Sequence, residues 1–347
     1  MSATKPLRIA VVGAGAFGRN HLRVYKELEQ AGEAVRLAAV VDRDAKVAAE
    51  AAAKFGVPAF SSIAECLAAV EGLDAASVCV PTVHHRAAAE ELIAAGLDVL
   101  IEKPLAPSLE DADSILALAR ERGRVVQVGH LERFNPAVTA ARRFLNHPMF
   151  FESHRLSIFT PRSLDVDVVL DLMIHDLDIV LSLVGSPVVE VRAVGLPVLS
   201  PKVDIANVRV EFESGCVANF TASRVSTERV RKLRFFQPHQ YLSLDFARQD
   251  LLMIDVTAAA GMDPAKLAAM AQLLQQQGEH PSAGLSLNKV QVEPGEPLRL
   301  EIASFLDAVR NRTEPVVSGE AGRAALKLAL EINAAISTHA ERAGLKV

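Results

Sequence analysis

The chain has 347 residues, half of them hydrophobic, which favours two folded domains with substantial cores. A net charge of −5 and a pI of about 6.1 argue against a general nucleic-acid-binding protein, because binding to phosphate backbones needs a basic surface. Three widely spaced cysteines, no signal-peptide layout and no apolar run of roughly 18 residues predict a cytoplasmic protein that does not bind membranes.

Residues 1–130 alternate short apolar runs with helix-like segments. The runs show no polar alternation, which indicates strands buried on both faces of a parallel sheet with helices on each side. We therefore predict an α/β doubly wound (Rossmann) domain. The predicted strands are 7–13, 35–42, 74–81, 98–104 and 124–130. One predicted helix follows the first strand and ends near residue 30, and three more cover 44–56, 84–96 and 108–123.

A glycine-rich loop follows the first predicted strand. It reads Gly13-Ala14-Gly15-Ala16-Phe17-Gly18 and opens a helix, which is the context that gives this spacing its meaning. Gly13 permits a tight turn, Gly15 lets a pyrophosphate approach the backbone, and Gly18 permits close packing of helix on sheet. Free N–H groups at the helix start favour phosphates. The loop predicts a dinucleotide site.

Asp42 ends the second predicted strand, at about the spacing expected for a residue that binds the adenosine ribose. Its carboxylate would accept hydrogen bonds from the ribose hydroxyls and repel a 2′-phosphate, which favours NAD. Arg43 follows directly and offers a phosphate contact, so NADP remains possible.

Residues 131–347 show a different pattern. Several runs alternate apolar and polar residues, which predicts an α+β domain with a large open antiparallel or mixed sheet. Its strands are expected at 150–159, 188–199, 205–214, 216–225, 229–237 and 240–249, and its helices at 131–145, 167–184, 263–277, 297–311 and 319–341. The C-terminal helices are free to pack back on the first domain.

The predicted helix 167–184 is apolar yet carries Asp171, His175, Asp176 and Asp178. Asp171, His175 and Asp178 share one stripe at helical spacing. Since a buried unpaired carboxylate is costly, this stripe should face water, a partner or a ligand. The stripe is therefore either a solvated outer face of the protein or the wall of a polar cleft, and the local sequence does not decide between these two interpretations.

Four motifs occur in an order that resembles the glucose-fructose oxidoreductase/inositol dehydrogenase (Gfo/Idh/MocA) family. They are Val80-Pro81-Thr82-Val83-His84-His85, Glu102-Lys103-Pro104, Asp171-x-x-x-His175 and the segment 301–332. The resemblance implies an NAD(P)-dependent oxidoreductase acting on a sugar-like hydroxyl. It also implies that the stripe faces the nicotinamide across a cleft, and that the second domain binds substrate and forms a homo-oligomer, a dimer or tetramer.

By the same resemblance, Lys103, Asp171 and His175 form the catalytic set. The chemistry agrees: His175 suits removal of the hydroxyl proton, and Lys103 suits donation to the oxygen as it gains negative charge. Glu102, Lys103, Pro81, Thr82 and His85 are implied to line the cofactor, although the family often has asparagine at the position of Thr82.

Five polar residues are further substrate-binding candidates. His130, Arg133 and Asn135 follow the last parallel strand, where a cleft should open, whereas Arg155 and Arg162 suit a phosphate or carboxylate on the substrate, with a surface salt bridge as the alternative. The basic run 228–236 is interpreted as a solvated sheet face. No complete metal site is predicted, because two or three ligands on one helix do not make one.

The stretches 164–185 and 224–246 are similar to bacterial family members of nucleotide-sugar and lipid A precursor metabolism. They favour the 3-hydroxyl of UDP-N-acetylglucosamine as the reacting group. An inositol or free-sugar dehydrogenase is the alternative within the same class. A non-catalytic NAD-binding sensor and an NAD-dependent glycoside hydrolase are the alternatives from other classes.

Overall fold

The computed structural model describes residues 5–159, 166–255 and 286–345, with a few scattered positions between 263 and 272. The chain forms two units. One comprises the chain up to Phe134 together with Gly295–Lys327, and the other comprises Asn135–Pro294 together with the chain from Leu328 onward. The predicted helix at 263–277 lies essentially outside the described residues.

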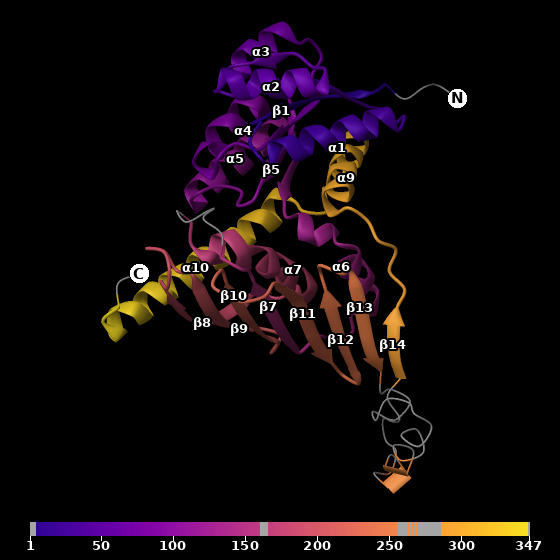
Figure 1. Cartoon of the computed structure of the whole chain (residues 1–347), viewed down its shortest axis with the longest axis vertical. Coiled ribbons are helices and arrows are strands. Elements are labelled where there is room, and N and C mark those ends of the chain that lie inside the picture. The colour runs from indigo at the N-terminus through magenta and orange to yellow at the C-terminus, as the bar shows by residue number, and fades with distance from the viewer. Residues whose placement is uncertain are drawn as a thin grey trace. The chain divides into compact units, whose positions relative to one another are not determined.

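The first unit contains a six-stranded sheet in the order β3-β2-β1-β4-β5-β6. Figure 1 labels two of its strands, β1 and β5. Every pair of neighbouring strands is parallel, which confirms the predicted doubly wound fold. The order reverses between β1 and β4, which is where such sheets bind ligands. The strands are β1 (Leu7–Val12), β2 (Val35–Val41), β3 (Ala59–Phe60), β4 (Ala75–Val78), β5 (Asp98–Glu102) and β6 (Val126–Gly129).

Two of the connecting helices, α2 and α5, begin and end at signals that the sequence carries. Asp44 caps α2, and the predicted cap Ser108 accepts a hydrogen bond from the backbone N–H of Asp111 at the start of α5. Gly56 and Gly123 end these two helices in the left-handed conformation. The helices are α1 (Gly18–Gln30), α2 (Ala45–Phe55), α3 (Ile63–Ala69), α4 (His85–Ala94) and α5 (Leu109–Arg122), with single 3-10 turns η1 (Thr82–His84) and η2 (Leu131–Phe134).

Residues from the C-terminal part of the sequence complete this unit. Helix α9 (Pro297–Asn311) packs on α1, and its Ile302 and Phe305 join the same buried cluster as Leu22 and Tyr25. Further on, Val128 N–H donates to the carbonyl of Val317 at 3.0 Å, beside β6.

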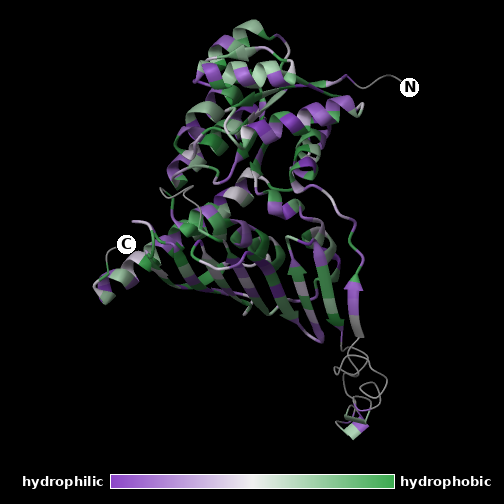
Figure 2. Ribbon diagram, viewed as in Figure 1, coloured by the Kyte–Doolittle hydropathy of each residue, from purple (hydrophilic) through white to green (hydrophobic). Residues whose placement is uncertain are grey.

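The second unit is built on an eight-stranded mixed sheet in the order β14-β13-β12-β11-β7-β10-β9-β8. β7 and β10 are parallel, and the other neighbours in the sheet are antiparallel. Figure 2 shows hydrophobic and hydrophilic bands alternating along these strands, as expected for a sheet with one buried face. The strands are β7 (Phe150–Leu156), β8 (Val188–Leu196), β9 (Ile205–Phe212), β10 (Val217–Ser223), β11 (Val230–Gln237), β12 (Gln240–Asp245), β13 (Asp250–Asp255) and β14 (Ser286–Val290).

The helices that are labelled in this unit cover one face of its sheet (Figure 1). The predicted helix 131–145 is broken, because Asn135 caps a new helix and Pro136 occupies its first turn. The helical elements are α6 (Pro136–Ala141), η3 (Arg142–Phe144), a π-helical turn η4 (Val169–Met173), α7 (Ile174–Val184) and the later part of α10 (Gly319–Ala343).

Among the described helices, none combines the length and the apolar run needed to cross a bilayer.

Candidate functional site

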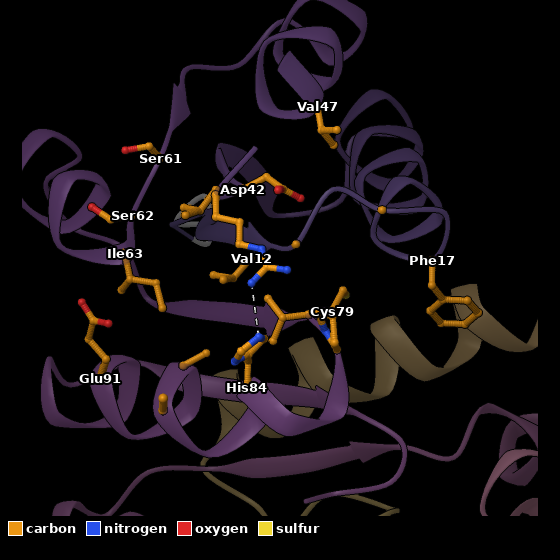
Figure 3. Close-up of a pocket in the computed structure, with 18 of the residues that line it drawn as sticks. Val12, Phe17, Asp42, Val47, Ser61, Ser62, Ile63, Cys79, His84 and Glu91 are labelled. Atoms are coloured by element: carbon orange, nitrogen blue, oxygen red, sulfur yellow. Dashed lines mark hydrogen bonds between the residues drawn. The ribbon is translucent and has the colours of Figure 1, made fainter. Parts of the chain in front are cut away.

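A cavity of about 690 Å³ opens at the carboxyl ends of β1, β2 and β4 (Figure 3). Seven of the predicted cofactor-binding residues line it. These are Gly13, Gly15, Ala16, Phe17, Asp42, Arg43 and Pro81. The cavity therefore lies where a doubly wound sheet binds dinucleotides.

The glycine-rich loop has the geometry that its spacing predicts. Gly13 has a φ of +95°, and a Cβ there would lie 2.6 Å from the backbone of Cys79. A Cβ on Gly18 would lie 1.8 Å from the Gly13 carbonyl oxygen. A Cβ on Gly15, by contrast, would meet no protein atom within 4 Å, which leaves open space beside the backbone. Helix α1 begins at this loop without a side-chain cap.

Asp42 is fixed against this loop. Its Oδ2 accepts a hydrogen bond from the Ala14 N–H at 2.7 Å, and its Oδ1 accepts one from the Asp44 N–H at 2.9 Å. The carboxylate thus keeps lone pairs for a ligand while both oxygens hold the turn. Next to it, an Arg43 guanidinium nitrogen lies 3.4 Å from His84 Nε2, and both side chains line the cavity (Figure 3).

Part of this cavity is not predicted by the sequence. His84 occupies the N-cap position of α4 but makes no side-chain capping bond, and it lines the cavity instead. Ser61, Ser62 and Ile63 also line it, at the start of α3. Their signal was weak because β3, the strand before them, has two residues. Val12, Val41, Val47, Ala87 and Ala88 supply apolar wall on which a flat base can pack.

Glu102 is the last residue of β5, and the Lys103–Pro104 peptide that follows it is cis. Lys103, Thr82, Glu102 and His85 do not line the cavity. Glu102 is buried, and its Oε1 lies 2.9 Å from Nε2 of the buried His21. The ring of His85 is also buried and lies between two backbone carbonyls, those of Val80 and Pro104. Glu102 and His85 thus make contacts inside the protein.

Burial shifts two titrating groups here. Desolvation lowers the pKa of His85, although hydrogen bonds to the carbonyls oppose this. Burial of the Cys79 thiol, together with the carboxylates of Glu102 and Glu301, raises its pKa well above the usual value. Cys79 lines the cavity but is not an activated nucleophile.

In the second unit, the Asp167 carboxylate begins the helical segment by accepting hydrogen bonds from the N–H groups of Val169 and Leu170. The regular helix expected over 167–184 instead starts with a π-helical turn that contains Asp171. Asp171 and His175 remain partly exposed, whereas Asp178 is buried. Two members of the predicted stripe are therefore partly accessible to solvent, and the third is not. Turns of this kind are frequent at functional sites.

Arg155 is not available for a substrate, nor is it in a surface salt bridge. It is 2% exposed and binds Asp176 with two hydrogen bonds, of 2.9 and 2.7 Å, and its guanidinium lies 5.3 Å from the centroid of the Phe246 ring. A planar guanidinium suits such a bidentate pair, which offsets the cost of burying both charges.

The other substrate candidates have different outcomes. Asn135 caps α6 through its side-chain oxygen and donates to the Phe246 carbonyl, so its amide is used within the second unit. His130 and Arg133 are buried, and Arg162 lies outside the described residues. In the basic run, Arg234 pairs with Glu152 at 3.0 Å, as expected of a sheet face.

These features fit a dinucleotide. The open space at Gly15 and the uncapped helix start suit a pyrophosphate, Asp42 suits a ribose, and the apolar wall suits an adenine.

Comparison with protein-family models agrees with this geometry. Residues 7–130 match the model described as an oxidoreductase family with an NAD-binding Rossmann fold, and residues 137–237 match the GFO/IDH/MocA C-terminal domain. The chain is also 36% identical over 337 residues to UDP-N-acetylglucosamine 3-dehydrogenase of Acidithiobacillus ferrooxidans, covering 97% of this chain and 99% of that protein. The chain belongs to the GFO/IDH/MocA family. It is an NAD-binding oxidoreductase.

Solved structures and curated proteins show further similarity. The structure of the A. ferrooxidans enzyme superposes with a TM-score of 0.84 at 35% identity, over 96% of this chain and 99% of that one. Inositol 2-dehydrogenase of Corynebacterium glutamicum is 31% identical over 197 residues, or 54% of this chain and 57% of that protein. An oxidoreductase domain protein from Kribbella flavida shares the fold, with a TM-score of 0.81 at 19% identity.

Proposed function

We propose that this protein is a UDP-N-acetylglucosamine 3-dehydrogenase, which oxidises the 3-hydroxyl to a ketone with NAD. The observation that carries the proposal is the near full-length similarity to the A. ferrooxidans enzyme of that name, at 36% identity. The cavity beside the glycine-rich loop supports it by suiting the cofactor. The 3-keto product would suit a later aminotransferase, in lipid A precursor metabolism.

Three residues carry the chemistry in this proposal. NAD, when bound, accepts the hydride from the carbinol carbon. His175 takes the hydroxyl proton, because imidazole titrates near neutral pH. Lys103 donates a hydrogen bond to the oxygen as negative charge develops there. Asp171 lies four residues before His175, and it orients the imidazole or binds a neighbouring hydroxyl.

The diphosphate of the substrate needs other partners than Arg155 and Asn135, because the structure uses both internally. Arg162 is kept for this role, whereas His130 and Arg133 are 0% and 7% exposed. The proposal also includes a cytoplasmic location and a homo-oligomer formed through the second sheet, on the face opposite its helices.

The first experiment follows absorbance at 340 nm with NAD and a panel of UDP-N-acetylglucosamine, other nucleotide sugars, free sugars and inositols. Reduction of NAD only with UDP-N-acetylglucosamine supports the proposal. Reduction only with inositols or free sugars would replace the substrate and keep the chemistry, and the similarity to inositol 2-dehydrogenase makes this the second candidate. Cleavage of the substrate without net formation of NADH would indicate a glycoside hydrolase. Binding of NAD without conversion of any substrate would indicate a sensor.

The acid–base assignment has its own test. His175→Ala should lower kcat about 10²- to 10⁴-fold while the Kd for NAD stays within about twofold, because the imidazole moves a proton and does not bind the dinucleotide. His154→Ala, a partly exposed histidine of β7, is the matched control. Unchanged turnover in the His175 variant would remove this residue from the mechanism.

A further inference from the structure

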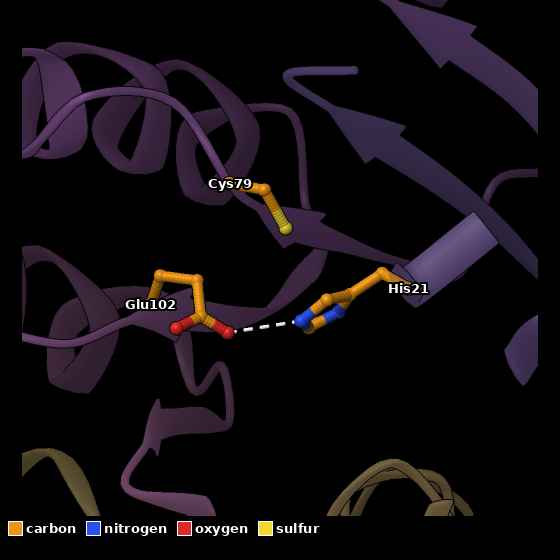
Figure 4. A group of neighbouring side chains, drawn as sticks. All are labelled: His21, Cys79 and Glu102. Atoms are coloured by element: carbon orange, nitrogen blue, oxygen red, sulfur yellow. Dashed lines mark hydrogen bonds and ion pairs between the residues drawn. The ribbon is translucent and has the colours of Figure 1, made fainter. Parts of the chain in front are cut away.

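The side chain that precedes Lys103 is held by an unusual buried contact in the first unit. Glu102 is 8% exposed, and its carboxylate lies 2.9 Å from Nε2 of His21, which is fully buried on α1 (Figure 4). A Cβ on Gly129 would lie 2.8 Å from the same carboxylate, so the neighbouring strand β6 leaves no spare room there. The Glu102 carboxylate is therefore confined between α1 and β6.

His21 is itself fixed from its other side. Its Nδ1 lies 3.2 Å from Oγ of Ser77 on β4, and this hydroxyl lies 2.8 Å from the Tyr25 hydroxyl on α1. Burial raises the pKa of Tyr25, so its hydroxyl keeps its proton. When Nε2 of His21 donates to Glu102, its Nδ1 can accept from the hydroxyl of Ser77. Tyr25 then donates to Ser77, Ser77 donates to His21, and His21 donates to the Glu102 carboxylate.

A second buried histidine contacts the residue that follows Lys103 in the sequence. The Nδ1 of His85, the first residue of α4, lies 2.9 Å from the carbonyl oxygen of Pro104, and its Nε2 lies 3.0 Å from that of Val80. The residues before and after Lys103 in the sequence are thus each contacted by a histidine from a different helix.

We propose that His21 and His85 are positioning residues, which hold Glu102 and Pro104 so that the intervening Lys103 presents its ammonium group in one fixed position. This inference rests on the proposed role of Lys103 in the reaction. Its physical reason is that a hydrogen-bond donor stabilises developing charge only when it is placed within tenths of an ångström. Neither histidine lines the cavity, so neither needs to touch the cofactor.

A cation site is the competing interpretation of the first cluster. The ligand atoms of His21, Cys79 and Glu102 all lie within 4.8 Å of one another (Figure 4). However, His21 Nε2 lies at hydrogen-bond distance from Glu102, and the raised pKa of Cys79 keeps its thiol protonated. A weak thiol ligand and a histidine–carboxylate hydrogen bond favour the positioning role.

The two ring nitrogens of each histidine can be tested separately, because a glutamine amide nitrogen reaches the place of Nε2 and an asparagine amide nitrogen the place of Nδ1. His21→Gln keeps the donor to Glu102, whereas His21→Asn keeps only the contact to Ser77. For His85 the order reverses: His85→Asn keeps the donor to Pro104, and His85→Gln keeps only the contact to Val80.

The experiment measures single-turnover NAD reduction with saturating UDP-N-acetylglucosamine, the Kd for NAD, and backbone hydrogen exchange in peptides that contain Lys103. We expect His21→Asn and His85→Gln to slow turnover about 10- to 100-fold, the range seen when the supports of functional groups are removed. Their partner variants should stay within about threefold of wild type. The Kd for NAD should change less than twofold in all four, and exchange at Lys103 should rise only in the two slow variants.

Tyr25→Phe is the control for a purely structural effect, since it removes the outer hydroxyl and leaves the His21–Glu102 contact. It should lower the unfolding midpoint without changing turnover.

Equal rates and equal exchange within each histidine pair would overturn the proposal. If His21→Asn does not fold, the His85 pair decides the matter. If wild type turns over no sugar, the proposed function fails, whereas exchange at Lys103 still tests the two histidines. Loss of wild-type activity on chelation, restored by Zn²⁺, would favour the cation site instead.

Discussion

Asp42 shows how one side chain serves both the fold and the ligand. It holds the backbone of the glycine-rich loop through Ala14 and lines the cavity beside Arg43. Asp42→Ala should therefore raise the Kd for NAD at least about tenfold, because hydrogen bonds to a charged group contribute about 1.5–3 kcal/mol. Asp42→Asn keeps an acceptor for the Ala14 N–H and removes the charge that repels a 2′-phosphate. It should bind NADP better than wild type does.

Fluorescence titration with NAD and NADP checks both variants. Glu50→Gln is a suitable control, because Glu50 is a surface partner of Arg19 on the neighbouring helix. An unchanged preference for NAD in Asp42→Asn would show that other groups discriminate between the two cofactors.

At the residue level, the sequence identified the glycine-rich loop and the end of β2 in the cavity, but not the residues at the start of α3 or His84. Gly13, Gly15 and Asp42 were predictable because their spacing is local. The pairing of Arg155 with Asp176 was not, because it joins a strand to a helix 21 residues away. Local sequence gives a charge and its neighbours, but not the partner that the fold brings to it.

At the level of elements, the turn from β1 to α1 predicts opposite outcomes for two similar substitutions. Gly15→Ala should fold with wild-type stability, since the new Cβ meets no protein atom, and should weaken NAD binding at least about tenfold by occupying space that a pyrophosphate needs. Gly18→Ala should lower the free energy of unfolding by at least about 2 kcal/mol, because its Cβ would overlap the Gly13 carbonyl. Thermal unfolding with and without NAD separates the two effects.

Elements with a strong pattern were predicted well, and short or interrupted ones were not. The predicted helix 297–311 is α9 with the same bounds, because it opens on a proline and keeps one apolar face. The two-residue strand β3 and the seven-residue helix α3 carry too few residues for a period to show. The break before Pro136 does have a local signal, because Asn135 is a good N-cap residue and proline is common in the first turn of a helix.

At the scale of the whole molecule, chain order and spatial order differ. Residues 295–327 complete the first unit, although the strands of the second sheet separate them in sequence from the rest of that unit, which ends at Phe134. Contacts such as Val128 with Val317 depend on how the chain returns, and no local pattern encodes them. The fold class itself was predictable, because uniform apolar strands and alternating strands imply different sheets.

The second sheet also predicts how copies of the chain associate. On the partly exposed side of this sheet, Phe150, Phe236 and Tyr241 form an aromatic cluster with ring centroids 4.9–5.5 Å apart, and Phe236 is 38% exposed. Phe236 is paired with Phe150 and Tyr241 on the two adjacent strands, and exposed aromatic residues on a sheet face are typical of interfaces. If the proposed homo-oligomer uses this face, Phe236→Glu should shift the sedimentation coefficient to that of a monomer, because it buries a charge without a partner.

The control is Leu300→Glu, on α9 of the first unit. It introduces the same charge at a similarly exposed site and should leave the oligomer intact. A monomer in both variants and in wild type would remove the oligomer from the proposal, and an unchanged oligomer in Phe236→Glu would place the interface elsewhere.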